Sequence, residues 1–234
     1  MNYEQARFNM IEQQIRPWEV LDSQVLSLLA LVKREDFVPP GHAALAFADL
    51  EVPLTPHFEK FPGRCMLSPK VEARLLQDLA VQKHETVLEI GTGSGYMAAL
   101  LGHRAQHVTT LEIDADLAQI ARRNLQRAGL YDVDVHTADG AELLGGQTSQ
   151  TNGVQAPRGP FDVIVLSGSV AAVPPQLLAL LKIGGRLWAI AGNKPMMRAT
   201  LVTRVGEAAF RTTQAWDTAA ARLLHFPEPS RFTF

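Results

Sequence analysis

The chain has 234 residues, of which 47% are hydrophobic and 20% charged, a balance that supports a sizeable core and excludes global disorder. Its net charge of −2 excludes an electrostatic footprint for nucleic acid. No apolar run is long enough to cross a bilayer, and the N-terminus lacks a signal-peptide pattern, so we expect a cytoplasmic protein with no membrane partner.

The N-terminal part of the chain is predicted to combine helices with an irregular stretch. Three segments have the apolar spacing of amphipathic helices: residues 3–16, 22–34 and 70–81. Asp22 is a plausible N-cap of the second helix, and Pro39-Pro40-Gly41 is expected to end it. Residues 41–69 are rich in proline, which predicts an irregular segment lying over another part of the molecule. Cys65, the only cysteine, is expected to be a small buried apolar residue.

From residue 85 onward, strands and helices are predicted to alternate, which is typical of a doubly wound α/β sheet. The predicted strands are 85–90, 107–112, 132–136, 162–166 and 186–191. The predicted helices are 96–104, 115–128 and 174–182. Gly184-Gly185 is expected to break the last helix, and the tail, 199–234, to supply two final strands, with 201–205 as one candidate. Residues 145–160 have almost no large apolar side chain, which predicts a mobile surface loop.

A glycine-rich turn after the first predicted strand is the most informative motif. The strand carries Glu89 near its end and is followed by glycines at alternate positions: Gly91, Gly93 and Gly95. Glycine has no Cβ, so such a turn lets the backbone approach a nucleotide-like ligand closely. The weaker form of the dinucleotide fingerprint is satisfied starting from Gly93. The acid and the three glycines fit better the E-x-G-x-G-x-G loop of S-adenosylmethionine (SAM) methyltransferases.

Acidic residues follow the next two predicted strands. Glu112 ends the second strand, where an acid accepts hydrogen bonds from ribose hydroxyls in nucleotide-binding α/β folds. Asp139-Gly140 follows the third strand and is read either as a site for an adenine amino group or as a simple turn. A buried Glu89 requires a partner, because an unpaired buried carboxylate is costly. It could orient backbone amides or, through water, a ligand ammonium.

The sequence offers few other candidates for chemistry. Ser167-Gly168-Ser169 follows the fourth strand, where catalytic groups often lie in this architecture, and a short polar loop is the equal alternative. The histidines show no metal-ligand spacing, so no metal site is expected.

Over nearly its whole length the chain resembles protein-L-isoaspartate O-methyltransferases. The resemblance is carried by the segments 10–15, 32–39, 46–49, 87–96, 160–165 and 174–187. It implies a mostly parallel seven-stranded Rossmann-like sheet with one antiparallel strand and an N-terminal helical extension. Residues 1–83 would cover the substrate and residues 84–234 would form the SAM-binding core.

The resemblance also implies an activity. SAM would be the methyl donor, S-adenosyl-L-homocysteine the product, and an isoaspartyl residue of a damaged protein the substrate, for a cytoplasmic monomer or homodimer. The implied cofactor contacts are Glu89, Gly91, Thr92, Gly93, Ser94, Gly95, Glu112, Ile113, Asp139 and Gly140.

The segment that precedes the core departs from the family pattern. The family reads Gly-Gln-Thr-Ile-Ser-(Gln/Ala)-Pro-(Tyr/His), with its serine at the active site, whereas this chain reads Gly63-Arg-Cys-Met-Leu-Ser-Pro-Lys70. Leu67 takes the serine position and Ser68 is its neighbour. If Ser68 moves into the serine's place it could hydrogen-bond the acceptor; otherwise Lys70 or Arg64 could attract a carboxylate. Ser167-Gly168-Ser169 also replaces the family's Thr-Ala-Ala.

The leading hypothesis is therefore a SAM-dependent O-methyltransferase that acts on isoaspartyl carboxylates in protein repair. The altered segment motivates two alternatives: a diverged methyltransferase with another small-molecule or protein acceptor, and a SAM-binding protein without transfer activity. An NAD-linked oxidoreductase is a distant fourth.

Overall fold

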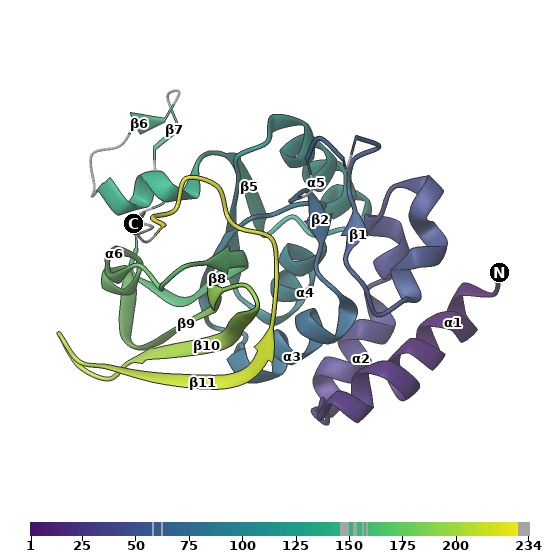
Figure 1. The fold of residues 1–234 in the computed structure, drawn as a ribbon, viewed down its shortest axis with the longest axis horizontal. Coiled ribbons are helices and arrows are strands. Elements are labelled where there is room, and N and C mark those ends of the chain that lie inside the picture. The colour runs from purple at the N-terminus through teal and green to yellow at the C-terminus, as the bar shows by residue number, and fades with distance from the viewer. Residues whose placement is uncertain are drawn as a thin grey trace, which may run out of the picture.

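A seven-stranded sheet forms the centre of the computed structural model, which describes residues 1–57, 59–61, 63–145, 150–151, 154–155, 157 and 159–228 (Figure 1). The strand order is β11-β10-β9-β8-β3-β4-β5. The strands are β3 (Thr86–Ile90), β4 (His107–Glu112), β5 (Val133–Thr137), β8 (Phe161–Val170), β9 (Leu181–Asn193), β10 (Met196–Arg204) and β11 (Phe210–Thr218). β10 pairs antiparallel with both of its neighbours, and the other pairs are parallel. The predicted doubly wound sheet with one antiparallel strand is confirmed.

Helical segments dominate the chain before the sheet. They are α1 (Tyr3–Met10), η1 (Ile11–Ile15), η2 (Arg16–Trp18), α2 (Ser23–Leu31), η3 (Arg34–Phe37), η4 (Pro40–Phe47) and α3 (Pro69–Leu79), with a short antiparallel pair of strands, β1 (Val52–Pro53) and β2 (Cys65–Met66), before α3. The Asp22 carboxylate accepts a hydrogen bond from the Gln24 amide at 2.8 Å, which confirms the N-cap.

The prediction that Pro39-Pro40-Gly41 ends the second helix is wrong. The helix ends at Leu31, because Val32 is extended and buried and the chain then turns to bury Arg34 and Phe37 in η3. Tertiary burial, which the local sequence does not reveal, decides this boundary.

Helices α4 (Tyr96–Arg104), α5 (Ala115–Arg127) and α6 (Pro175–Ala179), together with η5 (Gly140–Gly145), connect the strands of the sheet. Two further short strands, β6 (Gln150–Thr151) and β7 (Val154–Gln155), pair with each other. The mobile loop predicted at 145–160 lies largely outside the described residues. The predicted tail strands are confirmed as β10 and β11.

The prediction that Gly184-Gly185 separates a helix from a strand is wrong, because both glycines lie inside β9. Gly184 has φ +86°, and a Cβ on Gly185 would lie 2.9 Å from the Lys182 carbonyl oxygen and 3.0 Å from those of Phe161 and Asp162. The pairing of β8 with β9 shifts register at this point. The glycines thus allow an irregularity in a strand, which the sequence alone does not distinguish from a helix stop.

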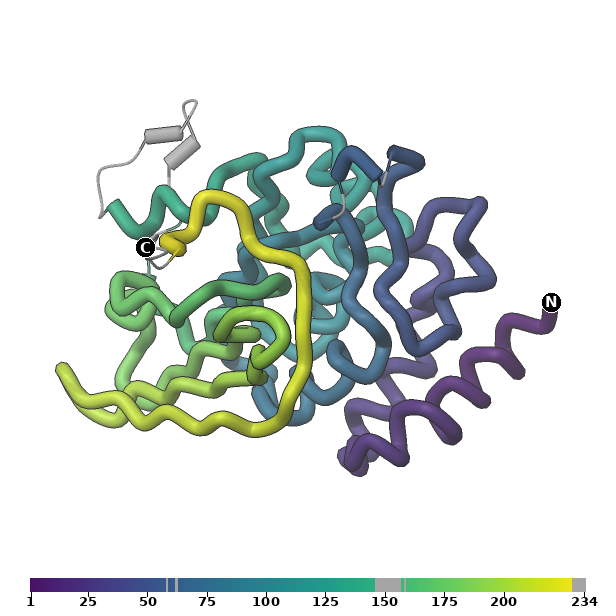
Figure 2. The backbone as a smooth tube through the Cα atoms, in the orientation of Figure 1, coloured from purple at the N-terminus to yellow at the C-terminus, as the bar shows by residue number. Residues whose placement is uncertain are grey.

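Alternate residues of the central strands face two different apolar layers. Val163 and Val165 belong to the larger cluster, together with residues of α1 to α5, whereas Ile164 and Leu166 belong to the smaller cluster, together with residues of α6. The N-terminal helices lie at one side of the molecule, and the last described residues, drawn in yellow, turn back to the other side (Figure 2). Within the described residues, no helix is both long and apolar enough to cross a membrane.

Candidate functional site

A cavity of about 710 Å³ lies at the carboxyl ends of the parallel strands. Its floor is made of residues that end or follow β3, β4 and β5, and of Ser167 and Gly168 near the end of β8. The chain winds outward in both directions from β3 and β8, so this edge is the topological switch point where α/β sheets bind ligands. Residues from two other stretches, 54–67 and 221–226, contribute most of the remaining walls, together with Lys194.

The predicted glycine loop lies at the floor of this cavity. All three of its glycines have positive φ values, +95° at Gly91, +56° at Gly93 and +89° at Gly95, a region that other residues rarely adopt. Gly91 and Gly93 line the cavity. Gly95 instead allows α5 to approach, since its Cβ would lie 3.3 Å from Ala121.

Thr92 and Ser94, which were predicted to contact the cofactor, lie outside the cavity lining and hold the loop in place. The Thr92 hydroxyl is hydrogen-bonded to that of Thr110 at 2.6 Å. The Ser94 carbonyl accepts a hydrogen bond from the Asn124 side chain at 2.9 Å. Their buried contacts explain why a residue of the motif need not face a ligand.

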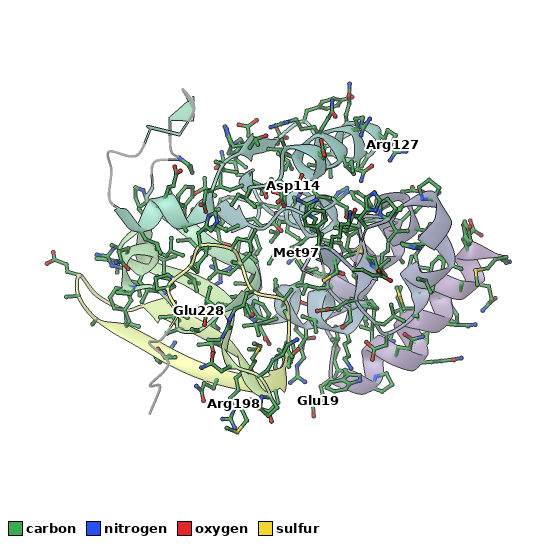
Figure 3. The ribbon with its side chains drawn as sticks, turned by 45° about the horizontal axis from the view of Figure 1, so that its top comes forward. Glu19, Met97, Asp114, Arg127, Arg198 and Glu228 are labelled. Atoms are coloured by element: carbon green, nitrogen blue, oxygen red, sulfur yellow. The ribbon has the colours of Figure 1, made fainter. Side chains whose placement is uncertain are left out.

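Glu112 lines the cavity and fastens the glycine loop to the end of β4. Its carboxylate accepts hydrogen bonds from the Gly93 amide at 2.7 Å and from the Asp114 amide at 3.0 Å. Burial raises the pKa of Glu112, although these two bonds favour the ionised carboxylate and partly oppose the shift. Ile113, a predicted cofactor contact, lies beside it on the cavity surface. Asp114 precedes α5, which carries Arg127 in its last turn (Figure 3).

Asp139 and Gly140 also line the cavity, at the end of β5. One Asp139 oxygen accepts from the Ala141 amide at 2.9 Å, and the other is 2.5 Å from His225 Nδ1. A Cβ on Gly140 would lie 2.3 Å from the Ile90 side chain, so only glycine fits there without rearrangement. Asp139-Gly140 can therefore form a turn and also contribute to a ligand site.

Glu89 has the partners that its burial requires, but it lies beneath the loop and outside the cavity lining. The hydroxyls of Ser167 and Thr110 each donate a hydrogen bond to its carboxylate at 2.7 Å. Burial raises the pKa of Glu89 to about 7, and these two bonds only partly offset the effect. Glu89 therefore supports the loop from within the sheet.

The altered segment puts Leu67 on the cavity wall, with its carbonyl oxygen 2.6 Å from a guanidinium nitrogen of the buried Arg34. Ser68, predicted to be catalytic, is outside the lining and buried at the start of α3. Lys70 is also outside: its ammonium is 2.8 Å from Asp49 and 4.0 Å from the Trp18 ring centre. Arg64 does line the cavity, paired with Asp114 and placed over the Phe61 ring.

Cys65 is not the fully buried residue that was predicted. It is half-buried on the cavity wall, with its thiol 3.4 Å from the Glu51 carboxylate. Burial, helped by the negative charge of Glu51, raises the pKa of the thiol to about 12. The thiol is therefore protonated at neutral pH and is a poor nucleophile.

The sequence did not identify the part of the wall that comes from the C-terminal segment. These residues are Ala221, Arg222, Leu223, Leu224 and Phe226. Their only signal is a short apolar run in a polar tail. Lys194, in the turn between β9 and β10, was also missed. Within the described part of the chain, no group of three or more histidine, cysteine, aspartate or glutamate residues could hold a metal ion.

Comparison with known proteins gives consistent results. The family model of protein-L-isoaspartate(D-aspartate) O-methyltransferase matches residues 5–218. The chain is 37% identical to the protein-L-isoaspartate O-methyltransferase of Rhodopseudomonas palustris, over 94% of this chain and 96% of that one. It is 36% identical to that of Koribacter versatilis, over 85% and 81% of the two chains.

Solved structures share the fold. A Plasmodium falciparum protein in complex with S-adenosyl-L-homocysteine, described as a candidate protein-L-isoaspartate O-methyltransferase, has a TM-score of 0.72 at 17% identity, over 95% of this chain and 98% of that one. A second structure, a protein-L-isoaspartate O-methyltransferase, has a TM-score of 0.70 at 21% identity, over 92% and 65%.

Proposed function

This chain belongs to the protein-L-isoaspartate O-methyltransferase family, and we propose that SAM and the methyl acceptor meet in its cavity at the carboxyl edge of the sheet. The chain is a SAM-dependent O-methyltransferase of protein repair. Methylation of an isoaspartyl carboxylate gives an ester, whose later non-enzymatic cyclisation leads back toward normal aspartate.

The residues at the floor of the cavity fit the cofactor. Gly91 and Gly93 present backbone without side chains, and Glu112 offers carboxylate oxygens for ribose hydroxyls. Asp139 would accept a hydrogen bond from the adenine amino group through the oxygen that lies 2.5 Å from His225 Nδ1, while its other oxygen accepts from the Ala141 amide. Bound SAM supplies an electrophilic methyl group on a sulfonium cation.

The walls of the cavity suit an acceptor that arrives already ionised, and this observation carries the substrate proposal. An isoaspartyl α-carboxylate, with a pKa of about 3.5, needs no general base at neutral pH. These walls contribute apolar side chains such as Leu67 and Leu223, a protonated thiol at Cys65, and the cations Lys194 and Arg64, of which Arg64 is paired with Asp114. Apolar side chains exclude water, and cations attract a carboxylate.

Incubation of the purified protein with methyl-labelled SAM and two matched peptides, one isoaspartyl and one aspartyl, tests this proposal. Base-labile label on the isoaspartyl peptide alone is the expected result. SAM binding without label on either peptide would sink the substrate assignment and favour the second candidate, a methyltransferase with another acceptor, which Leu67 at the family serine position supports. A protein that binds SAM and methylates no acceptor would be a binding protein only.

Three sequence predictions stay predictions: the cytoplasmic location, the choice between monomer and homodimer, and the role of residues 1–83 as a cover for the substrate. The last is supported by Leu54, Arg64 and Leu67, which come from this region and line the cavity.

A further inference from the structure

The C-terminal segment, residues 219–226, is an irregular stretch that forms one wall of the cavity. After β11 the chain leaves the edge of the sheet and turns back across the molecule (Figure 1). Its lining residues are Ala221, Arg222, Leu223, Leu224 and Phe226. Phe226 is buried in the smaller apolar cluster, which anchors the far end of the segment. A wall without regular secondary structure needs other contacts to fix its position.

Ser169, near the end of β8, makes most of these contacts. Its amide donates to the Ala221 carbonyl at 2.8 Å, and its carbonyl accepts from the Leu223 amide at 2.9 Å. Its hydroxyl lies 2.9 Å from the Ala220 carbonyl oxygen and 3.2 Å from that of Ala221, so its single proton can be donated to either. Ser169 is fully buried, where an unmade hydrogen bond is expensive.

Arg222 adds a second attachment on the same segment. Its guanidinium donates to the Ser169 hydroxyl oxygen at 3.3 Å and to the Asn193 side chain at 2.5 Å, and is 2.8 Å from the Glu228 carboxylate. The Ser169 hydroxyl is therefore both a donor to the segment and an acceptor from it.

Leu223 is held in a notch between two glycines. A Cβ on Gly91 would lie 3.0 Å from the Leu223 side chain, and one on Gly168 would lie 2.8 Å from it. The absence of a side chain at position 168 therefore lets Leu223 pack directly against the end of β8 and the glycine loop. A larger residue there would push Leu223 away, and Leu223 is part of the cavity surface.

We propose that Ser169 is a positioning residue for the methyl acceptor: it holds residues 220–223 so that Leu223, seated between Gly91 and Gly168, sets the shape of the acceptor side of the cavity. The proposal rests on the function proposed above. Ser169 acts through the backbone of the segment and does not touch the acceptor. A loosened wall fits the acceptor less well and holds it less productively, so we expect a higher KM for the acceptor without a matching change in SAM binding.

The first test compares Ser169→Ala with Thr200→Val, a matched loss of a buried hydroxyl in β10, outside the cavity. In Ser169→Ala we expect KM for the isoaspartyl peptide to rise at least fivefold, while the Kd of SAM measured by calorimetry changes less than twofold. Thr200→Val should change neither value by more than twofold. An unchanged KM in Ser169→Ala, or equal changes in KM and in the SAM Kd, would overturn the positioning role.

The second test is a double-mutant cycle on the notch. Gly168→Ala should raise KM for the peptide, because its Cβ displaces Leu223. In a Leu223→Ala background the same change should add less than twofold, since the side chain it collides with is gone. If the two substitutions instead raised KM independently, so that their effects multiplied, Leu223 would not transmit the effect of Gly168→Ala. A wild-type protein that is inactive on the isoaspartyl peptide would instead refute the proposed function, so the two failures are distinguishable.

Discussion

At the scale of single residues, the acids around the glycine loop divide into two roles. Glu112 is on the cavity surface and Glu89 is beneath the loop, although both were predicted from the same motif. The difference is one of depth: Glu89 pairs with Thr110, two residues before Glu112, so both acids share one face of the sheet. Glu89 lies inside β3, whereas Glu112 is the last residue of β4, at the edge where the cavity lies.

Replacing Glu112 by Gln is expected to weaken SAM binding at least tenfold. The amide keeps the size of the side chain but loses the charge that accepts from the Gly93 amide and from ribose hydroxyls. Titration calorimetry with SAM measures the change. Asp116→Asn is the matched control, because Asp116 is exposed in the first turn of α5 and outside the cavity lining. Equal affinity in Glu112→Gln and wild type would refute the ribose assignment.

Glu89 should make stability depend on pH. Its pKa is near 7 in the folded protein, against an ordinary value of 4.5, so the folded state keeps a proton that the unfolded state loses. The contribution to stability is thus full below pH 4.5 and is lost as the pH rises through 7. The change amounts to about 3 kcal/mol for this shift.

The variant Glu89→Gln, which imitates the protonated form, should match wild type near pH 4.5 and exceed it in free energy of unfolding at pH 8. Urea unfolding at the two pH values measures this. Glu207→Gln, at an exposed position, should show no such trend. Glu72, whose pKa burial also raises to about 7, keeps its own contribution in both proteins. A constant difference between wild type and Glu89→Gln at both pH values would contradict the assignment.

At the scale of elements, Arg186 on β9 connects three parts of the fold. Its guanidinium makes two hydrogen bonds to the Glu85 carboxylate, at 2.7 and 2.9 Å, and one to the carbonyl of Leu79 at the end of α3. Burial alone would raise the pKa of Glu85, but the bonds and charge of Arg186 together with the bond from the Gln82 amide outweigh it and hold the pKa below the ordinary value. The pair therefore stabilises the packing of α3 on the sheet at pH values above the ordinary pKa of the carboxyl. This stabilisation is lost as the pH falls and Glu85 becomes protonated.

Arg186→Gln is expected to lower the free energy of unfolding by about 3 kcal/mol, because it leaves a largely buried carboxylate without its cation. Arg198→Gln is the control on the neighbouring strand. The side chains of its ion pair with Asp217 are 54% and 82% exposed, so its loss should cost less than about 1 kcal/mol. Similar losses in the two variants at pH 7 would show that the buried pair does not hold α3 to β9.

The boundaries of elements were predictable only where local chemistry fixes them. The Asp22 cap and the start of β4 match the prediction, because a capping side chain and an apolar run are local signals. The end of α2 and the role of Gly184-Gly185 do not match, since a buried turn and a strand irregularity depend on the residues packed against them.

At the scale of the whole molecule, residues on both sides of position 83 share one apolar cluster. It contains Leu75 and Leu79 of α3 together with Leu100 of α4, Val163 of β8 and Trp188 of β9. The indole of Trp188 also donates toward Asp78 of α3 at 3.4 Å. Residues 1–83 and 84–234 therefore share one core. We propose that they differ only in their roles at the site.

Residues 84–234 expressed alone should not fold, because removal of the N-terminal helices exposes the apolar face of the sheet that they cover. Circular dichroism during a urea titration should show a cooperative transition for the full chain and none for the fragment. A fragment that unfolds cooperatively would establish the core as an independent domain.

The sequence by itself determined the sheet, its glycine loop and the acids at the strand ends, because alternating apolar strands, glycines and capping residues are local signals of a known architecture. Tertiary structure alone decided which of these residues face the cavity. Glu89 beneath the glycine loop and Thr92 and Ser94 within it are buried away from the cavity, and Ser68 and Lys70 do not line the cavity wall. The tertiary structure also brought Leu223 against Gly91, across more than half the chain, and such contacts depend on how distant segments pack.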